Sequence, residues 1–252
     1  PTRDKVSLIA SRSYDSYSKE QLEARLRDNP FSFLHIVNPG YKYDKVISGK
    51  ERYTLVRNRY QEFKEDQYFI KDEQPSYYVY RIVNRDGSIF NGIVAAASTD
   101  DYEDNVIKKH EETLQYKEAI FVEYLKTVGF NAEPVLLTYP DNDGLAAIIK
   151  KVMSDRPEYE FTTTYRDTHY VWPVSSIEIL TKIQDTFTSM DALYIADGHH
   201  RCSSSHLLAK KSKEENTAHT GQENYNYFMS FLIPESDLKI FEFNRLVKDL
   251  NG

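Results

Sequence analysis

Apolar residues recur along the chain at two spacings, one typical of helices and one typical of strands. Helical spacing, with a capping box from Ser18 to Gln21 at the first start, favours a run of amphipathic helices. The predicted helices span residues 18–29, 51–65, 104–128, 145–153, 176–189 and 199 to about 211. Alternating or continuous apolar runs between turn residues predict strands. The predicted strands span residues 31–37, 133–139 and 193–196, besides three hairpin pairs.

Three pairs of predicted strands are joined by short polar turns. In the clearest pair, residues 77–83 and 89–97 flank Asn84-Arg85-Asp86-Gly87, where glycine accepts the positive φ that such a turn needs. Residues 160–165 and 169–174 predict a second hairpin, and residues 227–233 and 238–243 a last pair. Residues 213–223 are polar and unpatterned, which predicts a loop.

The order of these elements predicts the fold class. Helices and strands alternate, but hairpins interrupt the alternation, so we expect an α+β fold with a mixed sheet flanked by helices. We expect residues 1–252 to form one unit, with an N-terminal part at about 1–140 and a second part at about 141–252. The chain ends without a closing element, so we also expect it to be part of a longer protein.

Composition and charge narrow the possible partners. The 252 residues carry a net charge of −7 and the pI is about 5.6, which argues against a general nucleic-acid or membrane-surface binder. A single cysteine, Cys202, excludes an intramolecular disulfide framework and a cysteine-rich zinc site. No apolar run approaches the length of a membrane span. We therefore expect a cytoplasmic protein that acts on a small molecule.

The most informative segment is the predicted turn at Asp197-Gly198, after an apolar strand and before a helix. Backbone N–H groups at the start of such a helix form an anion site. His199, His200 and Arg201 add side-chain donors, and a guanidinium can bind a phosphate through two hydrogen bonds. This pattern predicts a phosphate-binding turn. The alternative is an ordinary Asp-Gly turn followed by two solvated histidines.

A second group of polar residues lies near the start of the predicted 104–128 helix. On a helix, His110, Thr113, Leu114 and Lys117 would share one face, with Glu111 at its edge. A histidine, a hydroxyl group and a lysine on one face could hold a phosphorylated ligand. The alternative is a solvated, charged helix face. Near the end of the chain, Arg245 is either an anion partner or an exposed charge.

The residues give little indication of a metal. Asp197, His199, His200 and His206 are close in sequence, but no His-Glu-x-x-His or Cys/His pairing is present. We expect no tightly bound metal, whereas Mg²⁺ could arrive with a nucleotide. Cys202 is either a small buried residue or a thiol activated by the helix start.

Many short segments match, in order, a family of bacterial and archaeal proteins. They include Tyr14-Asp15, Asn29–Leu34, Gly92–Ala95, Ile107–Thr113 with Lys117, Glu133–Val135, Ile195–Arg201 and Asn244-Arg245. The chain resembles, over nearly its whole length, the family known as domain of unknown function ten-fifteen. It departs from the family where Arg12-Ser13 replace the prolines that usually precede the Tyr-Asp pair.

The Asp-Gly-His-His-Arg turn also resembles that of the ParB/sulfiredoxin superfamily, which binds nucleotide phosphates. The resemblance implies a ParB/sulfiredoxin-like core around the turn. The free-serine kinases of this superfamily have the most similar motif, Asp-Gly-His-x-Arg, which matches Asp197, Gly198, His199 and Arg201. Sulfiredoxin activity is not expected, because Cys202 follows the arginine instead of preceding the histidine.

The resemblance implies phosphate-ester chemistry on a small hydroxylated metabolite, most simply serine or phosphoserine, in the kinase or the phosphatase direction. The expected catalytic residues are Asp197, Glu111 and His110. The expected phosphate- or nucleotide-binding residues are Gly198, His199, His200, Arg201, Lys117 and Arg245. The alternative is a non-catalytic nucleotide-binding regulator of the ParB or sporulation-partition type, a likeness at the level of fold.

Overall fold

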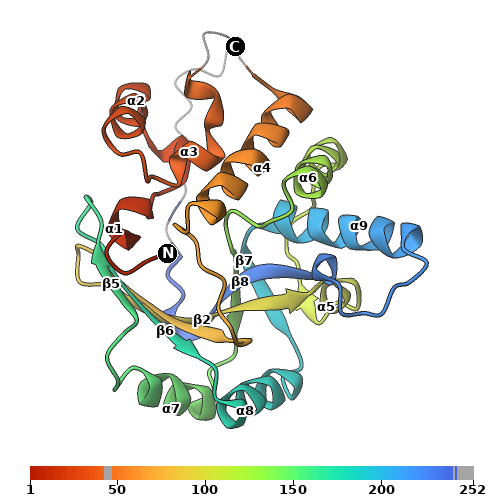
Figure 1. Ribbon diagram of the computed structural model, residues 1–252. Helices are drawn as coiled ribbons and strands as arrows, with labels where there is room; N and C mark the ends of the chain where they lie inside the picture. The colour runs from red at the N-terminus through yellow and green to blue at the C-terminus, as the bar shows by residue number, and fades with distance from the viewer. Residues whose placement is uncertain (43–46, 241, 243–252) are drawn as a thin grey trace, which may run out of the picture.

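A mixed β-sheet forms the centre of the protein, with helices on both of its faces (Figure 1). The computed structural model describes residues 1–42, 47–240 and 242. The eight strands of the sheet are β1 (Tyr77–Val83), β2 (Ile89–Ser98), β3 (Ile107–Lys108), β4 (Val135–Tyr139), β5 (Tyr159–Thr162), β6 (Thr168–Val174), β7 (Leu193–Asp197) and β8 (Tyr227–Pro234). The expected α+β class with a mixed sheet is therefore confirmed. The ParB/sulfiredoxin likeness of the turn region stays a prediction.

The strand order is β3-β7-β4-β8-β2-β1-β6-β5. The half from β5 to β8 is antiparallel throughout, because β6, β1 and β2 pair with their neighbours in that sense. The other half is mixed, since β4 is parallel to β8, antiparallel to β7, and β7 is parallel to the edge strand β3. Because β3 and β7 are parallel neighbours, their carboxyl ends lie at the same end of the sheet.

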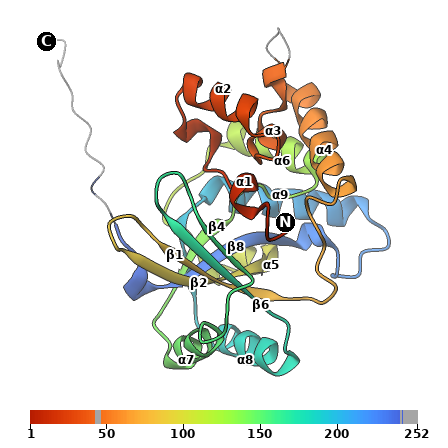
Figure 2. The same ribbon diagram turned by 60° about the vertical axis from the view of Figure 1, so that its left-hand side comes forward.

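The helices form a thick layer on one face of the sheet and a thin layer on the other. The thick layer contains α1 (Val6–Ile9), α2 (Lys19–Asp28), α3 (Leu34–Val37), α4 (Gly49–Glu65), α6 (Gln115–Val128) and α9 (His199–Glu215). Helices α7 (Asp143–Val152) and α8 (Ile177–Thr188) cover the other face, as Figures 1 and 2 show. The short helix α5 (Thr99–Glu103) connects β2 to β3. Within the described residues, no helix is long and apolar enough to cross a membrane.

Two apolar clusters hold these layers together. The larger one joins the sheet to its helices and includes Val79 and Ile93 from the sheet and Leu145 and Ile183 from α7 and α8. The smaller one lies among α3, α4 and α6, where Ile36, Val56, Phe63 and Val128 are buried among tyrosine and phenylalanine rings. The second cluster fixes α6 against the N-terminal helices, and α6 in turn packs beside α9.

Strand β2 approaches β8 so closely at Gly92 that no side chain fits there. A Cβ atom on Gly92 would overlap the carbonyl oxygen of Leu232 and lie 2.6 Å from the ring of Phe231. Glycine is therefore required at this point by space and not by an unusual φ angle.

Several sequence predictions are confirmed. The capping box has both of its bonds, from the Gln21 backbone to the Ser18 side chain and from the Ser18 backbone to the Gln21 side chain. Strands β1 and β2 form the expected hairpin, with Gly87 at φ 84° in the turn. The second hairpin, β5–β6, is also present.

Two sequence predictions are wrong, and a third lies partly outside the described residues. Residues 31–37 form no strand, because Leu34–Val37 is a helical turn whose first backbone N–H, that of Leu34, donates to the Ser32 hydroxyl. Residues 104–128 are not one helix. Asn105 has a positive φ of 59°, and residues 107–108 pair with β7 before α6 begins at Gln115. Of the strand predicted at 238–243, residues 238–240 are irregular and residues 241 and 243 lie outside the described part.

Candidate functional site at the end of strand β7

The Asp-Gly turn lies at the end of an inner strand, as the sequence predicts. Strand β7 runs between β3 and β4 and ends at Asp197, and Gly198 is the first flanking residue of α9, with φ 101° and ψ 31°. A Cβ atom on Gly198 would lie 3.2 Å from Nε of Arg201. Both the positive φ and the close guanidinium therefore favour glycine at this position.

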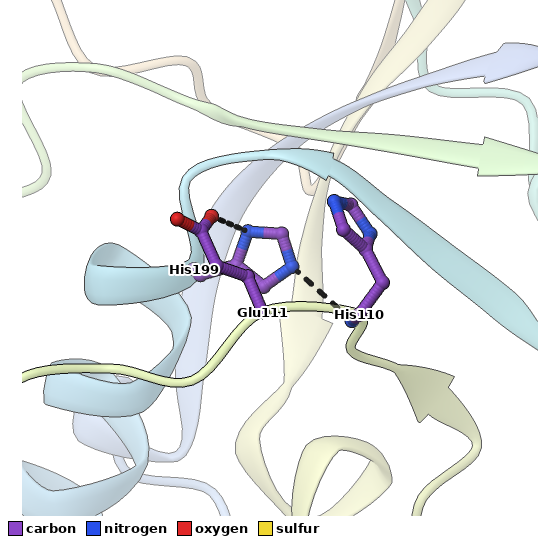
Figure 3. Close-up of side chains that lie close together, drawn as sticks. All are labelled: His110, Glu111 and His199. Atoms are coloured by element: carbon purple, nitrogen blue, oxygen red, sulfur yellow. Dashed lines mark hydrogen bonds and ion pairs between the residues drawn. The ribbon is translucent and has the colours of Figure 1, made fainter.

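The turn meets the segment that follows β3, although about ninety residues separate them in the chain. The rings of His110 and His199 are perpendicular, with centroids 4.4 Å apart. Glu111 reaches the other side of His199, where one carboxylate oxygen lies 3.4 Å from Nδ1 (Figure 3). The two segments meet because the parallel strands β3 and β7 end at the same edge. The closeness of His110 to the turn is confirmed.

The element that carries His110 differs from the prediction. His110, Thr113 and Leu114 lie in the irregular segment between β3 and α6, while Lys117 lies in the first turn of α6. The predicted common helix face of these four residues is therefore wrong. The edge strand β3 supplies backbone hydrogen bonds to β7 that a continuous helix would lose.

His199 is a buried histidine held in one orientation. Its side chain is 6 % exposed, and burial, followed by the neighbouring His110, lowers its pKa below the usual range. The Glu111 carboxylate can only accept a hydrogen bond, so it favours the tautomer with the proton on Nδ1. Nε2 then carries the lone pair, and it lies 3.5 Å from the backbone N–H of His110. In the structure this lone pair accepts the hydrogen bond from the His110 backbone, and a neutral imidazole that releases this long bond is suited to accept a proton.

The same three side chains could hold a divalent cation. His110, Glu111 and His199 each offer one ligand atom, and these atoms lie within 4.8 Å of one another. The 3.4 Å between His199 Nδ1 and Glu111 is close to the roughly 3.3 Å edge of a tetrahedral zinc site. A cation bound to Nδ1 would replace the proton on Nδ1 that faces the Glu111 carboxylate. Cation binding and the proton-accepting tautomer therefore exclude each other.

Arg201 is committed to partners within the protein. Its guanidinium lies 2.6 Å from Asp197 and 3.6 Å from Glu133, and it donates to the carbonyl oxygen of Pro134. These contacts join the start of α9 to the end of β7 and the start of β4. Asp197, expected as a general base, is thereby held in an ion pair with Arg201.

The first turns of helices α6 and α9 lie side by side next to the histidines. The Glu118 carboxylate in the first turn of α6 accepts hydrogen bonds from Ser203 of α9 and from Thr113. These bonds hold its pKa below the usual range. Among the described residues, neither helix start has a side-chain cap. The N–H groups of Lys117 and Arg201 already donate to the carbonyl oxygens of Leu114 and Gly198, so the N–H groups that precede them in each helix are the ones available for an anion.

The other predicted site residues have mixed placements. Lys117 is half-buried at the start of α6. His200 Nδ1 is buried and, in the described part of the chain, has no hydrogen-bond partner. Cys202 is buried, and burial raises its pKa to about 12, so it is a packing thiol and not a nucleophile. Arg245 lies outside the described residues.

Sequence reasoning missed Glu118, Ser203 and Glu133 as parts of this site. The Glu118–Ser203 bond joins residues 85 positions apart, and Arg201 binds a carbonyl 67 positions away. Glu133 is the first residue of an expected strand, and only the antiparallel pairing of β4 with β7 brings it to the turn. No local pattern carries that information.

The comparisons with known proteins give one match. A family model described as a protein of unknown function, DUF1015, matches residues 1–252. No curated protein and no solved structure matches the chain. The match covers every segment from the N-terminal helices to the turn after β7. The chain therefore belongs to the DUF1015 family of proteins of unknown function.

Proposed function

We propose that this protein carries out phosphate-ester chemistry on a small hydroxylated metabolite at the turn between β7 and α9. The observation that carries the proposal is the convergence of Glu111 and His110 on the buried His199, beside two uncapped helix starts. The preferred substrate class, serine or phosphoserine, comes from the resemblance of the Asp-Gly-His-x-Arg turn to that of the free-serine kinases.

In this proposal His199 is the general base. Its Nε2 takes the proton from the attacking hydroxyl group, which is the serine hydroxyl in the kinase direction and water in the phosphatase direction. A new O–P bond forms as the bond from phosphorus to the leaving oxygen breaks. Glu111 stabilises the imidazolium that results, as a carboxylate does when it orients a catalytic histidine. Asp197 has a positioning role through Arg201.

The charge of the phosphate is met mainly by fixed backbone groups. The N–H groups at the starts of α6 and α9 provide donors that need no rearrangement during the reaction. Lys117 and His200 add side-chain donors from the first turns of the same two helices. Phosphoryl transfer needs positioning and charge neutralisation more than covalent catalysis, which this arrangement supports.

Phosphorus NMR tests the proposal directly. The protein is incubated with phosphoserine, and separately with serine, Mg²⁺ and either ATP or ADP. We expect release or transfer of phosphate in one of these reactions. His199→Gln is expected to reduce the rate at least about 100-fold, the usual contribution of a general base. His206→Gln, on the same helix but packed against Tyr102, is the matched control and should retain the rate.

The alternative function predicts a different result. A nucleotide-binding regulator would bind ATP or ADP with no turnover of any of these substrates, and His199→Gln would change only the affinity. Nucleotide binding without phosphate transfer would therefore contradict the catalytic proposal and favour the regulator.

A further inference from the structure

A separate cavity of about 450 Å³ lies between the N-terminal helices and the α6–α9 pair. Its wall is formed by the segment before α2, by α4, by α6 and by α9. The volume is within the range of small-molecule sites, about 300–1,000 Å³. No step of the chemistry proposed at the turn after β7 uses this cavity.

The cavity has an aromatic wall. Tyr53 of α4 and Tyr124 of α6 both line it, and their rings meet edge to face with centroids 5.3 Å apart. Phe121, one turn before Tyr124 on the same helix, lines it too and is 38 % exposed. One exposed ring beside two half-buried rings forms an apolar surface on which an aromatic ligand can pack.

The cavity also has a strong positive charge for its size. Three arginines and one glutamate are among its lining residues. Arg201 and Glu133 pair with each other, which leaves Arg12 and Arg52. Arg12 stacks on the Tyr165 ring, with its guanidinium carbon 4.4 Å from the ring centroid. Arg52 donates to the Val37 carbonyl and lies over the ring of Tyr14. Aromatic stacking leaves in-plane N–H donors free for an anion.

The cavity and the histidine site use different faces of α9. Arg201, Ser204 and Ser205 are spaced three and four residues apart and line the cavity. His199 and Ser203 lie on another face, toward Glu111 and Glu118. A ligand in the cavity would therefore contact the helix of the histidine site without touching the histidines.

We propose that this cavity binds a small organic anion with an aromatic body and a carboxylate or phosphate-type head. The rings of Tyr53, Phe121 and Tyr124 would hold the body, and Arg12 and Arg52 the head. An arginine binds a carboxylate or a phosphate-type group through paired N–H groups, so the structure assigns an anionic head that either group would satisfy. The proposal does not depend on the chemistry proposed for His199.

The test uses three probes with the same ring system: 1-naphthoate, 1-naphthylphosphonate and the neutral 1-naphthalenemethanol. Isothermal titration with the whole chain measures the affinity of each. We expect at least one anion to bind at least about ten-fold more tightly than the alcohol, the effect of one charge-assisted contact. The two anions separate a carboxylate site from a phosphate-type site.

Variants locate the binding. Arg12→Gln is expected to weaken anion binding about ten-fold and to leave the alcohol unaffected, whereas Phe121→Ala weakens all binding probes. Arg57→Gln, an exposed arginine of α4 outside the cavity, is the matched control and should bind like the wild type. His199→Gln should also bind the probes normally, which separates this site from the proposed chemistry.

Three results would overturn the proposal. The first is that neither anion binds. The second is that the neutral alcohol binds as tightly as both anions. The third is that Arg12→Gln and Phe121→Ala both bind the anions like the wild type. Circular dichroism of each variant identifies any loss of fold, and Arg12, at the exposed mouth, is the variant on which the conclusion depends.

Discussion

Replacing Arg201 should lower the free energy of unfolding, because its guanidinium contacts Asp197 and the carbonyl oxygen of Pro134. The Asp197 ion pair joins a guanidinium that is 28 % exposed to a carboxylate that is 71 % exposed, so solvent limits it to less than about 1 kcal/mol. The hydrogen bond from the guanidinium to the carbonyl oxygen of Pro134 adds about 1.5 kcal/mol. Arg201→Met should therefore lower the free energy of unfolding by about 2 kcal/mol, or about 4–8 °C in Tm for a chain of this size.

Arg201→Lys separates the charge from the shape of the guanidinium. Lysine keeps the charge but cannot reach Asp197 and Pro134 at once, so we expect it to lose about 1 kcal/mol. Urea unfolding is followed by the fluorescence of Trp172, the single tryptophan, which is 6 % exposed. A loss below about 0.5 kcal/mol in Arg201→Met would show that these contacts do not stabilise the turn, and the reasoning would fail.

Three further predictions concern the sheet, pH and metal ions. Gly92→Ala should cost about 3 kcal/mol in urea unfolding, because its Cβ overlaps β8, whereas Gly40→Ala, with its nearest contact at 3.9 Å, should cost less than about 1. Burial lowers the pKa of His169, whose Nδ1 shares a hydrogen bond with the Tyr80 hydroxyl, so its contribution to stability is complete above pH 6.5 and is lost as the pH falls. His169→Gln should flatten the stability-against-pH curve below pH 6.5; an unchanged slope would contradict this. Zn²⁺ should inhibit phosphate transfer by displacing the Nδ1 proton, and Glu111→Gln should weaken Zn²⁺ binding measured by titration; equal affinity would exclude Glu111 as a ligand.

The sequence predicts elements well where local chemistry determines them. The β1–β2 hairpin depends on a four-residue turn ending in Gly87, and α2 on the capping box of Ser18 and Gln21. It fails where tertiary pairing prevails over local preference. Residues 107–108 have no strong local signal, and their strand exists because β7 lies beside them. Residues 31–37 are as apolar as a strand, but packing among α4 and α6 favours a helical turn.

The candidate site is predictable only in its parts. The Asp-Gly turn and the segment around His110 are each visible in the sequence as polar residues after apolar runs. Their meeting depends on the parallel pairing of β3 with β7, which joins residues about ninety apart. The commitment of Arg201 to Asp197 and Pro134 depends equally on β4, so sequence reasoning could not distinguish a free guanidinium from a bonded one.

Because β3 is an edge strand, the part of the site that contains His110 and Glu111 should be locally less stable than the part that contains His199. Its hydrogen-bonded pairing covers only two residues, whereas β7 pairs on both sides and continues into a helix of 17 residues. Opening the β3 edge breaks few bonds, so the His110–Glu111 half should exchange its amide hydrogens much faster than the His199 half. That half would then open and close while α9 stays folded. Solvent and small solutes could reach the buried imidazole through this local opening, without unfolding of the core.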